Sequence, residues 1–156
     1  MGAPGRFWDE SLEAIGSLKQ RAVLLAGGSE AQRLTAVAPP TVCVTGYAPH
    51  APIFARASAV VHHGGVGTTA QALRSGKPML VVPHAHDQPD NAYRVSRLGV
   101  ACVLNAQGYR APAVARLLRR LLQDGRHRAR ATEVGRAVSA ERGLETACAF
   151  ILEACG

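Results

Sequence analysis

Short runs of apolar residues alternate along this chain with longer stretches of helical spacing. Five runs are apolar at almost every position and lie beside glycine or proline, as strands do at turns. Because their apolar residues do not alternate with polar ones, we expect strands that are buried on both faces. The five predicted strands are residues 21–26, 41–45, 59–63, 78–82 and 100–104.

The segments between and after these runs carry the helical pattern. Residues 7–19 place four apolar side chains close to one helical face, with acidic residues in the first half, where the helix dipole favours them. A loop marked by two prolines precedes the third strand and leads into a helical turn. The other predicted helices are residues 68–75, residues 91–98 and the whole segment from 111 to the end, with a break at 124–125.

Buried strands that alternate with helices predict an α/β fold, a Rossmann-like parallel sheet with helices on both faces. The length suits a single domain over residues 1–156, and no linker or repeat divides it. In such sheets ligands bind at the carboxyl ends of the strands. One departure concerns the beginning, because a doubly wound domain usually opens with a strand and this chain opens with a helix.

The composition narrows the class of protein. The net charge of +7 comes from sixteen arginines and two lysines, but the basic helices after Arg110 carry no interleaved aromatic residues, so we expect no nucleic-acid partner. No apolar run approaches the roughly 18 residues of a membrane span, and the N-terminus lacks a signal-peptide pattern, which predicts a cytoplasmic protein. Without a C-x-x-C pair, reduced and buried structural thiols are expected at Cys43, Cys102, Cys148 and Cys155.

The segment HHGGVGTTA, residues 62–70, follows a predicted strand and opens a predicted helix. Glycines let an anion approach the backbone, and the amides of a helix N-terminus attract negative charge. Thr68 and Thr69 can add hydroxyl donors. A phosphate site is therefore expected, although a tight turn that binds nothing needs the same glycines.

A dinucleotide fingerprint also matches this segment. Gly65, Gly67 and Ala70 fit G-x-G-x-x-G/A, and Asp87 lies where a ribose-binding acid would be expected. That motif normally occupies the first strand-to-helix turn of its domain, whereas two strands precede it here. NAD or FAD binding is thus the weaker reading of the residues alone.

The order of four segments favours a different class. YAPH (47–50), HHGGVGTTAQAL (62–73), SGKPMLVVP (75–83) and DQPDN (87–91) together resemble the C-terminal donor-binding domain of UDP-glycosyltransferase-like enzymes with the GT-B fold. The resemblance is greatest to bacterial members that glycosylate natural products, macrolides and sterols. It implies transfer of a hexose from a UDP- or dTDP-sugar to a small-molecule acceptor, with no bound metal and no cofactor.

The resemblance also implies roles for individual residues. His63 would contact the donor diphosphate, with Gly65, Gly67 and Thr68 cradling its phosphates. Tyr47 would stack on the base, and His50 would lie near it. The remaining implied positions, which would bind sugar or ribose hydroxyls or lie beside them, are Gln71, Asp87, Gln88 and Asn91.

Three further expectations concern Gln71, His62 and metal binding. Family members that use UDP-sugars commonly carry glutamate where this chain has Gln71. An amide cannot accept hydrogen bonds from both ribose hydroxyls as a carboxylate does. Donors with deoxyribose, such as dTDP-sugars, are therefore at least as plausible as UDP-sugars. His62 is expected to face the core rather than the ligand. His84, His86 and Asp87 have metal-ligand chemistry, but no metal site is expected.

The resemblance implies that the rest of the enzyme is missing. The family's catalytic base lies in an N-terminal domain, so no catalytic residue is expected in this chain. The family's first strand also normally lies in the middle of the sheet, and its absence would leave two unpaired edges. A partner chain, self-pairing or a slipped strand order could fill that place. Two further readings stay open: a donor subunit of a split enzyme and a non-catalytic nucleotide-binding module.

Overall fold

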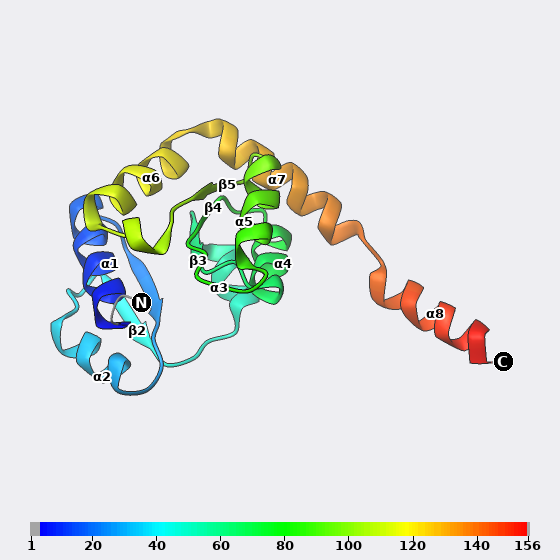
Figure 1. The fold of residues 1–156 in the computed structure, drawn as a ribbon, viewed down its shortest axis with the longest axis horizontal. Coiled ribbons are helices and arrows are strands. Elements are labelled where there is room, and N and C mark those ends of the chain that lie inside the picture. The colour runs from blue at the N-terminus through cyan, green and yellow to red at the C-terminus, as the bar shows by residue number, and fades with distance from the viewer. Residues whose placement is uncertain (1–3, 156) are drawn as a thin grey trace.

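The computed structural model describes residues 4–155, which fold into parallel strands and the helices that cover them (Figure 1). The strands are β1 (Ala22–Leu25), β2 (Val42–Thr45), β3 (Val60–His62), β4 (Met79–Val81) and β5 (Ala101–Val103). The helices are α1 (Pro4–Leu18), α2 (Gly28–Val37), α3 (His50–Arg56), α4 (Val66–Arg74), α5 (Gln88–Arg97), α6 (Ala111–Gln123), α7 (Gly125–Ala140) and α8 (Gly143–Cys155), with a 3₁₀ turn at Ala106–Gly108.

The strands form two parallel sheets instead of one. β1 pairs with β2, starting at Ala22 opposite Val42, and β3, β4 and β5 pair in that order. The predicted α/β class with parallel strands is confirmed. The expected gap in the sheet, with an unpaired strand edge on each side, is confirmed too, since no hydrogen-bonded pairing joins the two sheets among the described residues.

Helices cover both faces of the three-stranded sheet, as predicted. Alternate residues of β4 and its continuation divide between the faces: Leu80 and Val82 pack against α6, whereas Met79 and Val81 pack among residues of α4 and α5. All four side chains are essentially inaccessible to solvent. This double burial explains why the sequence of this strand shows no polar alternation.

Helix α1 links the two sheets. Ala14 belongs to the apolar cluster beneath α6, while Ile15 packs with Leu24 and Val42 of the two-stranded sheet. The amide N–H of Ala111, at the start of α6, donates to the carboxylate of Glu10 (2.6 Å). α1 therefore holds both sheets in one body by packing and by capping α6.

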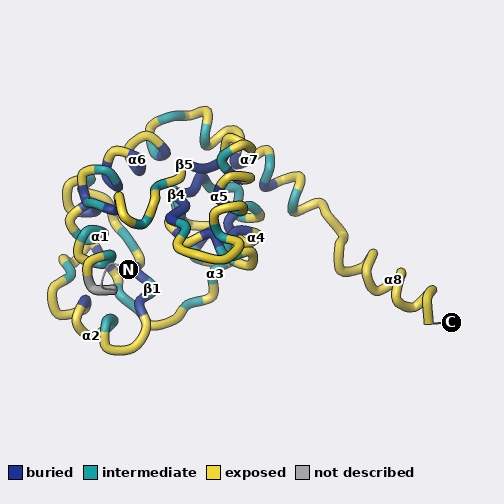
Figure 2. Tube along the Cα trace, in the orientation of Figure 1, coloured by how far each residue is buried: buried dark blue, intermediate teal, exposed yellow. Residues whose placement is uncertain are grey.

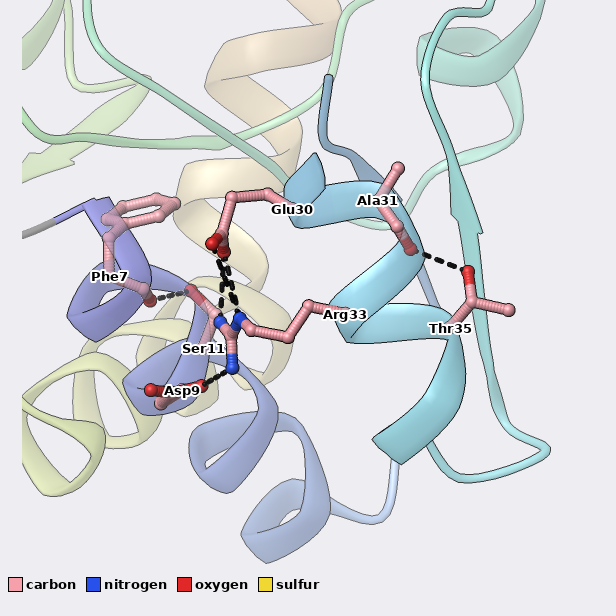
Figure 3. Close-up of polar contacts among 7 residues, drawn as sticks. All are labelled: Phe7, Asp9, Ser11, Glu30, Ala31, Arg33 and Thr35. Atoms are coloured by element: carbon pink, nitrogen blue, oxygen red, sulfur yellow. Dashed lines mark hydrogen bonds and ion pairs between the residues drawn. The ribbon is translucent and has the colours of Figure 1, made fainter. Parts of the chain in front are cut away.

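Polar contacts fix α2 against α1 (Figure 3). Arg33 of α2 donates to Asp9 of α1 at 2.8 Å and to Glu30 of its own helix at 2.9 Å. Leu34 is the one fully buried side chain of α2. The sequence predicts no helix here, because a single buried residue gives no apolar periodicity to detect.

Some predicted boundaries and environments need correction. α4 begins at Val66 instead of Thr68, and α5 begins at Gln88 instead of Asn91. The break predicted at 124–125 is confirmed, with Asp124 accepting from the backbone N–H of Arg126. Only one cysteine is buried, Cys102; the thiols at Cys43, Cys148 and Cys155 are exposed, because β2 has an open face and α8 is uncovered.

The last helix leaves the body of the molecule. Figure 1 shows α8 extending away from the sheets, and Figure 2 shows it exposed along its length. Leu144, Phe150 and Leu152 are each more than 70% exposed. Within residues 4–155, no helix has both the length and the apolar character that a membrane crossing requires.

Candidate functional site

The loop between β3 and α4 is built around one glycine. Gly64 has a φ of +93°, in the left-handed region that favours glycine. A Cβ at this position would also lie 3.0 Å from a methyl of Val81 and 3.2 Å from the carbonyl oxygen of Gln88. Both the backbone conformation and the close packing therefore require glycine here.

His62 anchors this loop from inside the sheet. The amide N–H of Gly64 donates to its Nδ1 (3.1 Å), and its Nε2 lies 3.3 Å from the sulfur of Met79. Burial above all, then the neighbouring His63 and His50, lowers the pKa of His62 to about 4. The ring is therefore neutral at pH 7 with Nδ1 as acceptor. The prediction that His62 faces the core is confirmed.

His63 lies on the opposite, solvent-exposed side of the loop. A Cβ at Gly65 would lie 2.6 Å from Nε2 of His63, so the imidazole rests directly against this glycine. Gly67 has open space where its Cβ would be. The loop therefore presents an imidazole and bare backbone to solvent at the start of α4.

The first turn of α4 is suited to an anion. Its N-cap is Gly65, which makes no side-chain capping bond, and no acidic residue lies in the first turn. The first amides of a helix have no intrahelical partner and carry the positive end of the helix dipole. An anionic oxygen beside Gly67 would satisfy them, with the His63 ring as a further donor.

The two threonines of this turn differ. Thr68 is partly exposed, but the Oγ1 of Thr69 is buried and has no hydrogen-bond partner in the described structure. Because α4 begins two residues earlier than predicted, Thr69 turns toward the core instead of the loop. Its hydroxyl therefore does not reach solvent in this conformation.

His50, the first residue of α3, lies near His62, and Tyr47 is on the loop that precedes it. His50 stacks on Phe54 with ring centroids 4.9 Å apart, and it acts electrostatically on His62. Tyr47 is 81% exposed, and its carbonyl oxygen accepts from the hydroxyl of Thr45. The structure thus brings His50 near His62 and leaves the Tyr47 ring free in solvent.

The loop between β4 and α5 is tied to the glycine loop by Asn91. Its Nδ2 donates to the carbonyl oxygen of Gly64 (2.9 Å) and to Asp87 Oδ2 (2.8 Å). Gln88 uses its Oε1 to accept from the amides of His84 and Ala85. Asn91 and the acceptor of Gln88 are therefore already engaged in shaping the site, while Asp87 stays exposed beside them.

Within the described residues, the side chains of Gln71, His84 and His86 take no part in this hydrogen-bond network. Gln71 is exposed on α4, one turn past Gly67. His84 and His86 are exposed with Asp87 on the loop before α5, and within residues 4–155 no group of three metal-ligating side chains is gathered.

Sequence reasoning missed the part played by Gly64. The doubled glycine of HHGGVG marked a tight loop, but only the structure shows which glycine takes the left-handed conformation and which lies under His63. The link from Asn91 to Gly64 spans 27 residues, and no local pattern signals it.

These features define a class of protein. The parallel α/β body superposes on the calicheamicin glycosyltransferase CalG4 with a TM-score of 0.85 over 97% of this chain and 41% of that one. At 24% identity this likeness establishes the fold, that of the C-terminal domain of GT-B glycosyltransferases.

The family follows from the sequence comparison. The chain belongs to the family described as erythromycin biosynthesis protein CIII-like, C-terminal domain, whose model matches residues 9–151. It is 38% identical over 135 residues to O-mycaminosyltylonolide 6-deoxyallosyltransferase of Streptomyces fradiae, covering 86% of this chain and 31% of that protein. It is 34% identical to a sterol 3-beta-glucosyltransferase of Eremothecium gossypii, covering 80% and 10%.

A solved relative carries a nucleotide. Glycosyltransferase VinC in complex with dTDP superposes with a TM-score of 0.76 and 25% identity, over 83% of this chain and 32% of that one. The expected resemblance to natural-product and sterol glycosyltransferases is confirmed. The chain spans about a third or less of the length of these relatives.

Proposed function

We propose that this chain binds a nucleoside diphosphate sugar and serves as the donor-binding part of a hexosyltransferase for a small-molecule acceptor. The observation that carries the proposal is the His63–Gly67 loop, where an exposed imidazole, uncovered glycine backbone and an uncapped helix start face the same space. A diphosphate would accept hydrogen bonds from these groups and offset the helix dipole. No metal is needed in this arrangement.

The neighbouring loops extend the proposed site on both sides. Tyr47 would stack on the base with His50 beside it, and Gln71 would reach the ribose from α4. Asp87 and the free Nε2 of Gln88 would bind hydroxyls of the sugar. Asn91 would hold the glycine loop in position. Thr68 would help cradle the phosphates, and Thr69 would join it only after a rotation, because its hydroxyl is buried.

In the complete reaction a deprotonated acceptor oxygen displaces the nucleoside diphosphate at the anomeric carbon of the sugar. The groups around His63 would stabilise the charge that develops on the leaving diphosphate. We place the base that deprotonates the acceptor outside this chain, in an acceptor-binding part. The isolated chain is therefore expected to bind nucleotide without transferring sugar.

The decisive test is calorimetric titration of the chain with dTDP, UDP and NAD, repeated on His63→Ala. Binding of the two diphosphates, weakened by roughly tenfold or more in His63→Ala, supports the proposal, since a charge-assisted hydrogen bond contributes about 1.5–3 kcal/mol. His84→Ala is the matched control, because that imidazole is exposed on a different loop. Preference for NAD over both diphosphates would overturn the proposal.

The nucleotide preference has its own test. Gln71 can accept one ribose hydrogen bond, whereas a carboxylate accepts two, so Gln71→Glu is expected to raise affinity for UDP roughly tenfold relative to dTDP, which lacks the 2′-hydroxyl. Titrations with both diphosphates measure the ratio. An unchanged ratio would show that Gln71 does not lie at the ribose.

A non-catalytic nucleotide-binding module and a donor subunit of a split transferase share this site. They are separated by adding an acceptor-binding half of a family member to the purified chain and measuring glycosyl transfer. Transfer that appears only in the mixture favours the split transferase, and nucleotide binding without transfer favours the module.

A further inference from the structure

Asp87 lies at the start of α5 but does not cap the helix. An aspartate at this position ordinarily accepts a hydrogen bond from a backbone N–H of the first turn. The backbone of Asp87 is already helical, with φ −75° and ψ −11°, and its carboxylate makes no such bond. Its Oδ2 accepts instead from Nδ2 of Asn91, one turn further on, at 2.8 Å. The carboxylate is therefore oriented by a neutral side chain while it stays exposed.

The same amide nitrogen also reaches the glycine loop. Nδ2 of Asn91 donates to the carbonyl oxygen of Gly64 at 2.9 Å. A side-chain amide nitrogen carries two hydrogens, so these two bonds use both of them. Asn91 therefore has no N–H left to donate to a sugar or ribose hydroxyl.

The backbone of Gly64 is held on both sides. Its N–H donates to Nδ1 of His62 at 3.1 Å, and its carbonyl oxygen accepts from Asn91. A Cβ on Gly64 would lie 3.2 Å from the carbonyl oxygen of Gln88, so this glycine packs directly on the start of α5. Gly64 leads into residues 65–67, where we propose that the diphosphate binds. The position of that stretch therefore depends on α5.

The two bonds of Asn91 have different effects. The bond to Gly64 is enough to hold the two loops together. The bond to Asp87 adds nothing to that contact, because Asp87 lies at the start of the same helix as Asn91. Its effect is to orient the carboxylate, which has about four acceptor sites. Within residues 4–155, Asn91 is the one side chain that bonds to this carboxylate, so the remaining sites are open to hydroxyl groups.

We propose that Asn91 is a positioning residue that couples recognition of the sugar to recognition of the diphosphate. Its amide holds the Asp87 carboxylate, proposed to bind sugar hydroxyls, and the Gly64 carbonyl, behind the diphosphate loop, in one geometry. A ligand that carries both parts then finds both already ordered, whereas without Asn91 it must order them on binding. This inference rests on the proposed function and goes beyond it, because Asn91 itself touches neither part of the ligand.

The test is calorimetric titration of the whole chain with dTDP and with dTDP-glucose. The ratio of the two dissociation constants measures what the sugar adds to binding. Asn91→Ala and Asp87→Ala are each expected to lower this ratio about tenfold, the loss of one charge-assisted hydrogen bond. The double variant should lower it no further than either single variant, because both changes remove the same interaction.

A matched control is available on the same helix. Asp90 is an exposed carboxylate that pairs with Arg94 at 2.7 Å and has no contact with the glycine loop in the described hydrogen-bond network. Asp90→Ala is therefore expected to leave the ratio unchanged. Thermal unfolding of every variant identifies any that fails to fold.

NMR of the unaltered chain tests the same coupling without a substitution. Hydrogen exchange of the Asn91 side-chain amide should slow when dTDP binds and slow further with dTDP-glucose, since each part of the ligand fixes one of its two acceptors. Exchange that is the same in the free chain and in both complexes would overturn the inference.

The titrations can overturn the inference in two further ways. A residue that only supports the fold would weaken both ligands equally, so an unchanged ratio in Asn91→Ala would contradict the coupling. A fall of about a hundredfold in the double variant would mean that Asn91 and Asp87 act independently. Failure of the unaltered chain to bind dTDP is a distinct result, because it would overturn the proposed function and this inference with it.

Discussion

At the scale of single residues, His62 couples the stability of the fold to pH. Its pKa is lowered from 6.5 to about 4, mainly by burial, so the unfolded chain binds a proton that the folded chain rejects. The contribution of neutral His62 to the free energy of unfolding is therefore fully present above pH 6.5. It is lost as the pH falls toward 4, and a pKa difference of this size corresponds to about 3 kcal/mol. Protonation would also break the bond from Gly64 to Nδ1.

The variant His62→Asn tests this coupling. An asparagine oxygen can accept from Gly64 as Nδ1 does, but it does not titrate. Denaturant unfolding at pH values from 7 to 4 should show that the variant loses about 3 kcal/mol less stability than the wild type over this range. Parallel pH profiles for the two proteins would contradict the assignment.

A substitution at Gly67 should change the stability of the fold and its affinity for ligand in opposite directions. Nothing lies within 4 Å of a Cβ at this position, and alanine is about 0.5–1 kcal/mol more favourable than glycine inside a helix. Gly67→Ala should therefore raise the melting temperature while lowering dTDP affinity, because the methyl group would occupy the space proposed for phosphate. Thermal unfolding and calorimetry measure both. Gly16→Ala in α1 is the control, with a similar gain in stability and unchanged affinity.

At the scale of elements, the backbones of α7 and of the end of α4 come closest at Gly135. A Cβ at Gly135 would lie 2.6 Å from the Cα of Gly76 and 2.9 Å from the carbonyl oxygen of Leu73. Both contacts are backbone atoms, so the helices must separate to admit a methyl group. Gly135→Ala is expected to cost about 1–3 kcal/mol in denaturant unfolding, opposite in sign to Gly16→Ala. Equal effects would show that α7 adjusts freely.

The elements also show what a sequence can predict. All five strands were predictable, since each apolar run is bounded by turn residues and buried on at least one face. α2 was not, because only Leu34 is buried in it. The start of α4 was misplaced because its N-cap, Gly65, has no side chain to signal it, and this error moved Thr69 from the proposed site into the core.

At the scale of the whole molecule, the proposed site depends on contacts between distant segments. His63, Gly65 and Asp87 can be singled out as candidate site residues from the sequence pattern around them. The bond from Asn91 to Gly64 and the neighbourhood of His50 and His62 follow only from how three strand-to-helix loops meet. The split sheet was predictable from a resemblance, whereas the exposure of α8 was not, because its apolar helical pattern is the same whether or not something covers it.

That exposure predicts how α8 contributes to the isolated chain. No residue of α8 is buried, so removing residues 143–156 should change the free energy of unfolding by less than about 0.5 kcal/mol. Light scattering should show less self-association, because Leu144, Phe150 and Leu152 leave with the helix. Removal of residues 125–156 is the control, and it should destabilise the fold because α7 buries Ala131 and Gly135 against α4. A large loss of stability from the shorter truncation would instead place α8 against the body of the protein in solution.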